Sequence, residues 1–77
     1  NHLMENAEEE LATLSKLTKR ETEILKLISQ NLNTKLIAEQ LFISEDTVLT
    51  HRKNLMAKLE IHNTAGLVAF ALKNHMS

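Results

Sequence analysis

The sequence predicts a small all-α domain of four helices, and three observations support this prediction. The chain has 77 residues, which allows one domain with a modest core. It contains no Pro and a single Gly, whereas the turns of sheet proteins require more of both. Apolar residues make up 43% of the chain, and they recur at helical spacing behind residues that cap helices.

Residues 1–16 are expected to form an N-terminal linker helix. Four apolar residues recur there at alternating spacings of three and four, surrounded by Glu: Met4, Ala7, Leu11 and Leu14. Two heptads are few for a coiled coil. We interpret the segment as a linker that follows an upstream domain, or as a remnant of cloning, with a subunit-pairing segment as the alternative. The folded domain is predicted over residues 17–77.

The first helix of the domain is predicted within residues 17–31. Thr18 followed by Glu21 forms a capping box, in which each side chain satisfies a free backbone amide of the other residue. An inward apolar stripe follows, made of Ile24, Leu25, Ile28 and Leu32. Asn31 is expected to end the helix, because Asn is the non-Gly residue that best tolerates positive φ.

Two further helices start eleven positions apart, at the N-cap residues Asn33 and Ser44. The first, over residues 34–41, has room for about two turns, and Phe42 and Ile43 connect it to the second. The second is predicted over residues 44–59. A short helix, a tight connection and a longer helix are typical of a helix-turn-helix.

The longer helix has two different faces. At about 100° per residue, Val48, Leu55 and Leu59 share a narrow face that should pack inward. The opposite face collects side chains that are short or flexible: Asp46, Leu49, Thr50, Lys53 and Ala57, with Asn54 at the margin. Such a face could lie against the edges of DNA bases, although a helical hairpin that binds no nucleic acid has the same pattern.

Asn63 should cap a last helix over residues 64–74. Leu67, Val68, Ala71 and Leu72 give this helix one apolar side, and Ala69 and Phe70 extend the apolar surface around it. A helix this apolar requires cover on more than one side.

The net charge of −1 is unusual for a DNA-binding protein, but the charge is unevenly distributed. Residues 1–16 carry a net charge of −3, whereas residues 17–77 carry eight basic and six acidic residues, a net charge of +2. The predicted domain is therefore mildly basic, and we expect its affinity for DNA as a monomer to be weak.

Several classes of site are not predicted. The chain has no Cys, which fits the reducing cytoplasm, and its four His residues contain no pair at i, i+4, so we predict no metal site and no cofactor. The sequence offers no nucleophile and base set and no Gly-rich phosphate loop, so we predict no enzyme activity. Its apolar runs are too short to span a membrane.

Four motifs follow one another along the chain: L-T-K-R-E-T-E-I-L-K-L-I at 17–28, N-T-K-L-I-A-E-Q-L-F-I-S at 33–44, T-V-L-T-H at 47–51 and K-L at 58–59. Together they closely resemble the LuxR/NarL/FixJ family of bacterial DNA-binding domains. The resemblance implies a helix-turn-helix domain of a transcriptional regulator, commonly the output domain of a two-component response regulator or of a ligand-sensing regulator. It also implies a dimer on an inverted-repeat operator, with RNA polymerase as a further partner.

The resemblance and the face of the longer helix together indicate candidate site residues. We expect contacts to bases from Leu49, Thr50 and Lys53. We expect contacts to DNA phosphates from Lys35, Thr47, Arg52 and Lys58. A second subunit is expected to pack on the last helix at Val68, Ala71 and Leu72.

The sequence departs from the family pattern at Leu49, where Lys or Arg is common, and at Thr64, where Arg is common. Leu49 removes a possible guanine contact and suggests contact with a thymine methyl group instead. Thr64 puts the details of the subunit contact in doubt. The alternative function is a helical protein-interaction module that uses the surface of residues 68–72 and binds no DNA.

Overall fold

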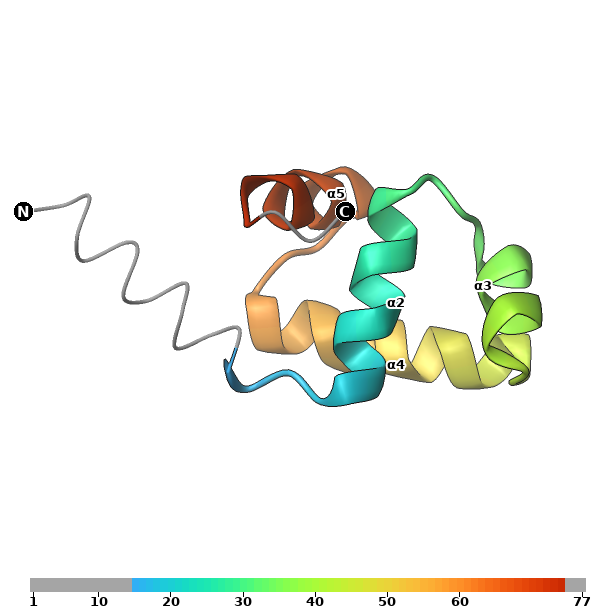
Figure 1. Ribbon diagram of the computed structural model, residues 1–77. Coiled ribbons are helices and arrows are strands. Elements are labelled where there is room, and N and C mark those ends of the chain that lie inside the picture. The colour runs from blue at the N-terminus through green and yellow to red at the C-terminus, as the bar shows by residue number, and fades with distance from the viewer. Residues whose placement is uncertain (1–14, 75–77) are drawn as a thin grey trace, which may run out of the picture.

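The computed structural model describes residues 15–74, and these contain four α-helices and no strand (Figure 1). The helices are α2 (Lys19–Ser29), α3 (Thr34–Leu41), α4 (Glu45–Leu59) and α5 (Thr64–Lys73). This confirms the predicted all-α fold. The apolar stripe predicted at Met4, Ala7, Leu11 and Leu14 lies outside the described residues, as do residues 75–77 of the predicted domain.

Each of the four helices begins at the predicted cap. The side chains of Thr18, Asn33, Ser44 and Asn63 accept hydrogen bonds from backbone amides three residues further on. The capping box of α2 is complete, because the Thr18 amide donates to Glu21 Oε1 at 2.9 Å and the Glu21 amide donates to Thr18 Oγ1 at 3.1 Å. Local sequence chemistry therefore determines where these helices start.

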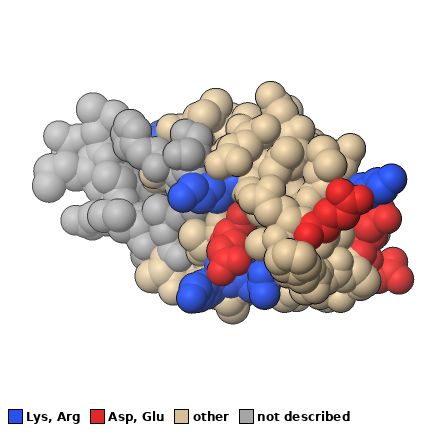
Figure 2. Space-filling view, turned by 45° about the vertical axis from the view of Figure 1, so that its right-hand side comes forward, with Lys and Arg blue, Asp and Glu red and all other residues tan. Residues whose placement is uncertain are grey.

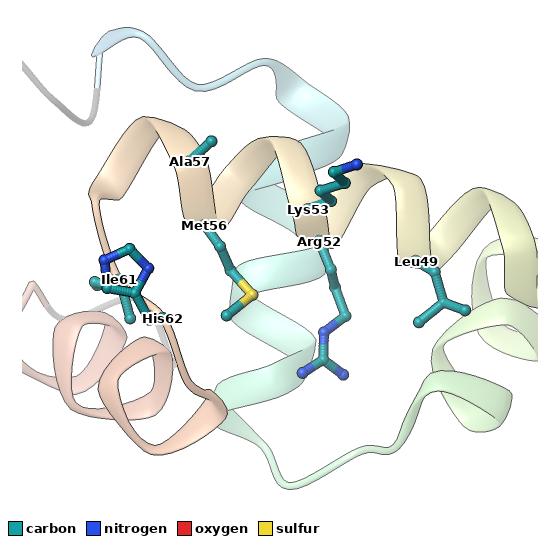
Figure 3. Close-up of a pocket in the computed structure, with 7 residues that line it drawn as sticks. All are labelled: Leu49, Arg52, Lys53, Met56, Ala57, Ile61 and His62. Atoms are coloured by element: carbon teal, nitrogen blue, oxygen red, sulfur yellow. The ribbon is translucent and has the colours of Figure 1, made fainter.

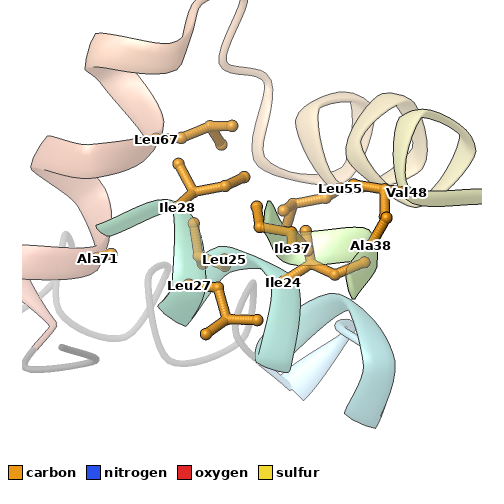
Figure 4. Close-up of a cluster of buried hydrophobic side chains, with 10 residues drawn as sticks. All are labelled: Ile24, Leu25, Leu27, Ile28, Ile37, Ala38, Val48, Leu55, Leu67 and Ala71. Carbon is orange, nitrogen blue, oxygen red and sulfur yellow. The ribbon is translucent and has the colours of Figure 1, made fainter. Parts of the chain in front are cut away.

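Helix α2 lies at the centre of the fold, with α4 crossing it on one side and α5 packing on another (Figure 1). Helix α3 packs mainly on α4. The core contains apolar side chains from all four helices (Figure 4): Ile24, Leu25, Leu27, Ile28, Ile37, Ala38, Val48, Leu55, Leu67 and Ala71. Because α2 supplies four of these ten residues, it holds the other helices at fixed positions around it.

Three helix ends are closed by residues other than Gly in the left-handed conformation: Asn31 (φ 65°), Phe42 (φ 58°) and Glu60 (φ 56°). At each of these ends an amide bonds back to a carbonyl five residues earlier, for example Ile43 N to Ala38 O at 3.0 Å. This is the hydrogen bond of a Schellman motif. The left-handed Asn31 was predicted, whereas Phe42 and Glu60 were not.

Replacing Phe42 or Glu60 by Gly should stabilise the domain. A side chain with a Cβ is strained at positive φ, and both residues are exposed, so little packing is lost. We expect each substitution to raise the melting temperature by about 4–8 °C, which corresponds to roughly 1 kcal/mol. Circular dichroism melts would measure the change, with Asn31→Gly as a control that has a smaller effect. A lower melting temperature for both variants would show that these side chains make stabilising contacts.

No helix within residues 15–74 has both the length and the apolar character that a membrane span requires.

Candidate nucleic-acid interface

Helix α4 exposes the face that the sequence predicts. Val48 and Leu55 are fully buried against the rest of the domain, and Leu59 is half-buried. All six residues of the opposite face are exposed: Asp46, Leu49, Thr50, Lys53, Asn54 and Ala57. We call this set the reading face. It runs along most of a 15-residue helix, which is a shape that fits the major groove of DNA.

The three predicted base-contacting residues differ in the chemistry they offer. The Lys53 ammonium has no hydrogen bond or ion pair to any residue in the described part of the chain, so it is free to donate. Leu49 is 51% exposed, although Leu is usually buried. The Thr50 hydroxyl donates to Asp46 O at 3.0 Å, which leaves its methyl group and the lone pairs of its oxygen available. The reading face therefore combines a charged donor with apolar contact surface.

A groove of about 580 Å³ extends the reading face toward the connection between α4 and α5 (Figure 3). Its lining comes from Leu49, Arg52, Lys53, Met56, Ala57, Ile61 and His62. In Figure 3, Arg52 and Met56 leave α4 on a different side from Ala57. The groove is thus bordered by the reading face on one side and by residues 61–62 on the other.

Lys35 and Thr47, two of the predicted phosphate contacts, are exposed in the first turns of α3 and α4. Lys35 has no hydrogen bond or ion pair among residues 15–74. The Thr47 hydroxyl is hydrogen bonded to the Ser44 hydroxyl at 2.9 Å. Since helix N-termini attract anions, both side chains are well placed for a phosphate.

The other two predicted phosphate contacts are used inside the domain. Arg52 is half-buried, and its Nη1 and Nη2 donate to the hydroxyls of Thr34 at 3.3 Å and Thr64 at 2.6 Å. Lys58 Nζ donates to Glu21 Oε1 at 2.7 Å and to the carbonyl of Lys16 at 3.2 Å. Both residues therefore connect α4 to other parts of the chain and do not belong to the reading face.

Glu21 is the buried charged residue of the described chain, with 3% of its surface exposed. Burial raises the pKa of its carboxyl group, but the hydrogen bonds from Lys58 and from the Thr18 amide, with the positive charge of Lys58, lower the pKa by more. The net pKa lies below its usual value. The sequence predicted the capping box of Thr18 and Glu21 but not the hydrogen bond from Lys58, which is 37 residues away along the chain.

The surface of α5 differs from the prediction at one residue. Ala71 is fully buried in the core, so the prediction that its side chain contacts a second subunit is wrong. It faces α2, on which α5 packs. Val68 is half-buried, and Leu72 is 53% exposed. Together with the exposed Ala65 and Ala69, Leu72 forms a small apolar surface on the outer side of α5.

Charged side chains form separate small groups on the face that Figure 2 shows, and they do not merge into one basic surface. Three exposed acidic residues lie on α3 and in the first turn of α4: Glu39, Glu45 and Asp46. Asp46 belongs to the reading face itself. Acidic groups suit the N-terminus of a helix but repel phosphates, so they lower the attraction of this surface for DNA.

Comparison with known proteins identifies similar domains. The family profile "Bacterial regulatory proteins, luxR family" matches residues 15–71. The oxygen regulatory protein NreC of Staphylococcus aureus is 39% identical, in a match that covers 99% of this chain and 37% of that protein. A nitrate/nitrite response regulator protein homolog of Haemophilus influenzae is 44% identical, in a match that covers 96% of this chain and 36% of that protein.

A solved structure shows the same arrangement of helices. The response regulator StyR superimposes with a TM-score of 0.88 at 38% sequence identity, over 94% of this chain and 36% of the StyR chain. The present chain thus spans about a third of the length of these relatives.

Proposed function

Because the chain belongs to the luxR family of bacterial regulatory proteins, whose helix-turn-helix domains bind DNA, we propose that the reading face of α4 enters the major groove and recognises a specific sequence. The observation that supports this proposal is the exposed face of α4, with Lys53 free and the short α3 placed before it. In helix-turn-helix proteins the second helix enters the groove while the first crosses the backbone.

Each predicted contact has a distinct role in this proposal. Lys53 can donate to guanine O6 or N7, and Leu49 and the Thr50 methyl group can contact thymine methyl groups. Lys35 and Thr47, at the positive ends of α3 and α4, bind phosphates and fix the position of the domain on the duplex. We leave Arg52 and Lys58 out of the interface, since their charged groups already bond to Thr34, Thr64 and Glu21.

Salt dependence of DNA binding tests the proposed function. With two free cations near DNA, Lys35 and Lys53, log K should fall with log salt at a slope of about −2 per bound subunit. Fluorescence anisotropy with short labelled duplexes at several salt concentrations would measure this slope. Lys35→Ala should make it shallower by about 1 and weaken binding to all sequences equally. No binding at low salt would contradict the proposal and favour the protein-interaction module.

The outer surface of α5 is the proposed contact between two subunits on an inverted-repeat operator. Leu72 is more exposed than an apolar side chain of this size usually is, and Ala65 and Ala69 beside it let a second helix approach closely. Two linked reading faces compensate for the weak binding that we expect of one mildly basic domain.

Leu72→Glu should disrupt this contact without unfolding the domain, because Leu72 is largely outside the core. We expect the affinity for a duplex with two half-sites to fall by about tenfold or more, while the affinity for one half-site changes little. Val68→Glu is the contrasting variant, since Val68 packs against the core and its replacement should lower the melting temperature. Equal cooperativity in the wild type and Leu72→Glu would exclude this surface as the subunit contact.

The relatives suggest the wider role of the protein. We propose that the chain is the DNA-binding output domain of a response regulator in a two-component system, by analogy with the nitrate/nitrite response regulator homolog and StyR. A regulator of this kind acts on the chromosome in the cytoplasm, where it recruits or blocks RNA polymerase. It is a binding domain and not an enzyme, and the proposed contacts to DNA involve no cofactor.

A further inference from the structure

Arg52 contacts the first turns of two other helices at once. Its Nη1 donates to the hydroxyl of Thr34, the first residue of α3, and its Nη2 donates to the hydroxyl of Thr64, the first residue of α5. Both threonines follow a capping Asn, so the same Asn-Thr pair starts both helices. The planar guanidinium group is suited to this geometry, because its two terminal nitrogens can donate to two acceptors at the same time.

The bond to Thr64 connects two helices, α4 and α5, that pack on each other only weakly, because α5 packs mainly on α2. The bond to Thr34 adds to the direct packing of α3 on α4. Arg52 and Thr64 line a recess between the end of α2 and the starts of α3 and α5, together with Ile28, Leu32 and Val68. Figure 3 shows the side chain leaving α4 on this inner side. Arg52 is thus a direct link from the helix that carries the reading face to α5.

The position of Arg52 on α4 links these bonds to the reading face. Lys53 is the next residue, and Leu49 lies almost one turn earlier. A rotation of α4 about its axis would therefore move both side chains relative to α3 and its phosphate-binding Lys35. Two hydrogen bonds from a charged group, to two different helices, oppose such a rotation.

We propose that Arg52 is a positioning residue, which holds the reading face at the orientation needed to recognise bases and does not itself bind DNA. This proposal rests on the proposed function. Loss of the two bonds should reduce the preference for the specific sequence over random DNA by about tenfold. Because no phosphate contact is lost, the slope of log K against log salt should stay within about 0.5 of the wild-type value.

Substitutions on both sides of the bonds test the proposal. Arg52→Lys keeps the charge but cannot donate to both hydroxyls from one planar group, and the double variant Thr34→Val/Thr64→Val keeps Arg52 but removes its acceptors. Both variants should lose preference for the specific sequence, while the slope of log K against log salt stays unchanged. Fluorescence anisotropy with specific and random duplexes would measure both quantities. Lys35→Ala is the matched control, since it removes a proposed phosphate contact and should make the slope shallower by about 1 while leaving the sequence preference unchanged.

Two results would overturn the proposal. The first is that Arg52→Lys and the double threonine variant keep the wild-type sequence preference and salt slope, while Arg52→Met has a shallower salt slope. Arg52 would then be a phosphate contact. The other comes from melting temperatures without DNA. Arg52→Met and Thr64→Val should each lower the melting temperature by a few degrees, and combining them should lower it no further than Arg52→Met alone. Fully additive shifts would show that the two side chains do not interact.

The melting experiment also separates this proposal from the proposed function. If the wild type shows no sequence preference, the proposed function fails, even when the melting temperatures confirm the bond from Arg52 to Thr64. If the wild type shows a preference and the Arg52 and threonine variants retain it in full, only the positioning role fails.

Discussion

Lys58→Met is expected to lower the free energy of unfolding by about 2–3 kcal/mol, although a surface lysine can usually be replaced at little cost. The reason is Glu21, which is 3% exposed and whose carboxylate would lose its charged partner. Breaking a fully buried ion pair costs more, but Lys58 keeps 34% of its side chain exposed, so solvent screens part of the interaction. The corresponding decrease in melting temperature is about 10–20 °C.

A paired substitution separates the loss of a partner from the loss of packing. The double variant Lys58→Met/Glu21→Gln removes both charges and should recover most of the lost stability, because the buried carboxylate is no longer present. Urea unfolding of the single and double variants would measure these differences. If Lys58→Met unfolds like the wild type but shows a shallower salt slope for DNA, then Lys58 binds phosphate, as the sequence suggested.

The stability of the domain should also depend on acid pH through Glu21. The pKa of Glu21 is lowered in the folded domain from its ordinary value of 4.5, so its contribution to stability is fully present above that ordinary value. The contribution of Glu21 to stability is lost as the pH falls through its lowered pKa in the folded domain, because protonation of the carboxyl group weakens the bond from Lys58. Glu21→Gln should therefore be less stable than the wild type at pH 6, and the difference should decrease in acid.

Lys53→Ala is expected to relax the preference for one G·C pair in each half-site, by roughly 1–3 kcal/mol or about 5- to 150-fold. Lys53 is the free cation of the reading face, and its ammonium can donate to guanine O6 or N7. Leu49→Lys should have the opposite effect. It adds a charge near the phosphates, which raises affinity for all sequences, and it shifts the preference at its own base step toward guanine.

Selection of preferred sequences from a random pool, at matched salt, would test both substitutions. Lys35→Ala is the control, because a phosphate contact carries no sequence information and its loss should leave the selected sequence unchanged. If Lys53→Ala and Leu49→Lys both select the wild-type sequence, then α4 does not lie in the groove as proposed. A changed preference in Lys35→Ala would mean that Lys35 reaches a base.

The parts of the fold that depend on neighbouring residues could be predicted from the sequence. The caps at Thr18, Asn33, Ser44 and Asn63 depend on residues three positions away, and the exposed side of α4 follows from the helical period. Left-handed ends were predictable only at Asn31. Phe42 and Glu60 adopt positive φ because the chain must turn there, and neither residue type indicates that conformation.

The contacts of Arg52 and Lys58 and the burial of Ala71 could not be predicted because they depend on residues distant in sequence. The partners of Arg52 lie 18 and 12 residues away, and Glu21 lies 37 residues from Lys58. A basic residue near a proposed DNA-binding helix looks the same whether it faces a phosphate or another helix. Similarly, the apolar residues of α5 gave no indication that Ala71 faces α2 while Leu72 faces solvent.

The most direct test of the reading face is an amide chemical-shift titration of the isotope-labelled chain with a selected half-site duplex. The proposed docking predicts that the largest changes occur along α4 at Leu49, Thr50 and Lys53, and near Lys35 at the start of α3. With a single half-site, the outer surface of α5 at Leu72 should change little. Changes that are confined to α5 and leave α4 unaffected would contradict the proposed docking of α4 in the major groove.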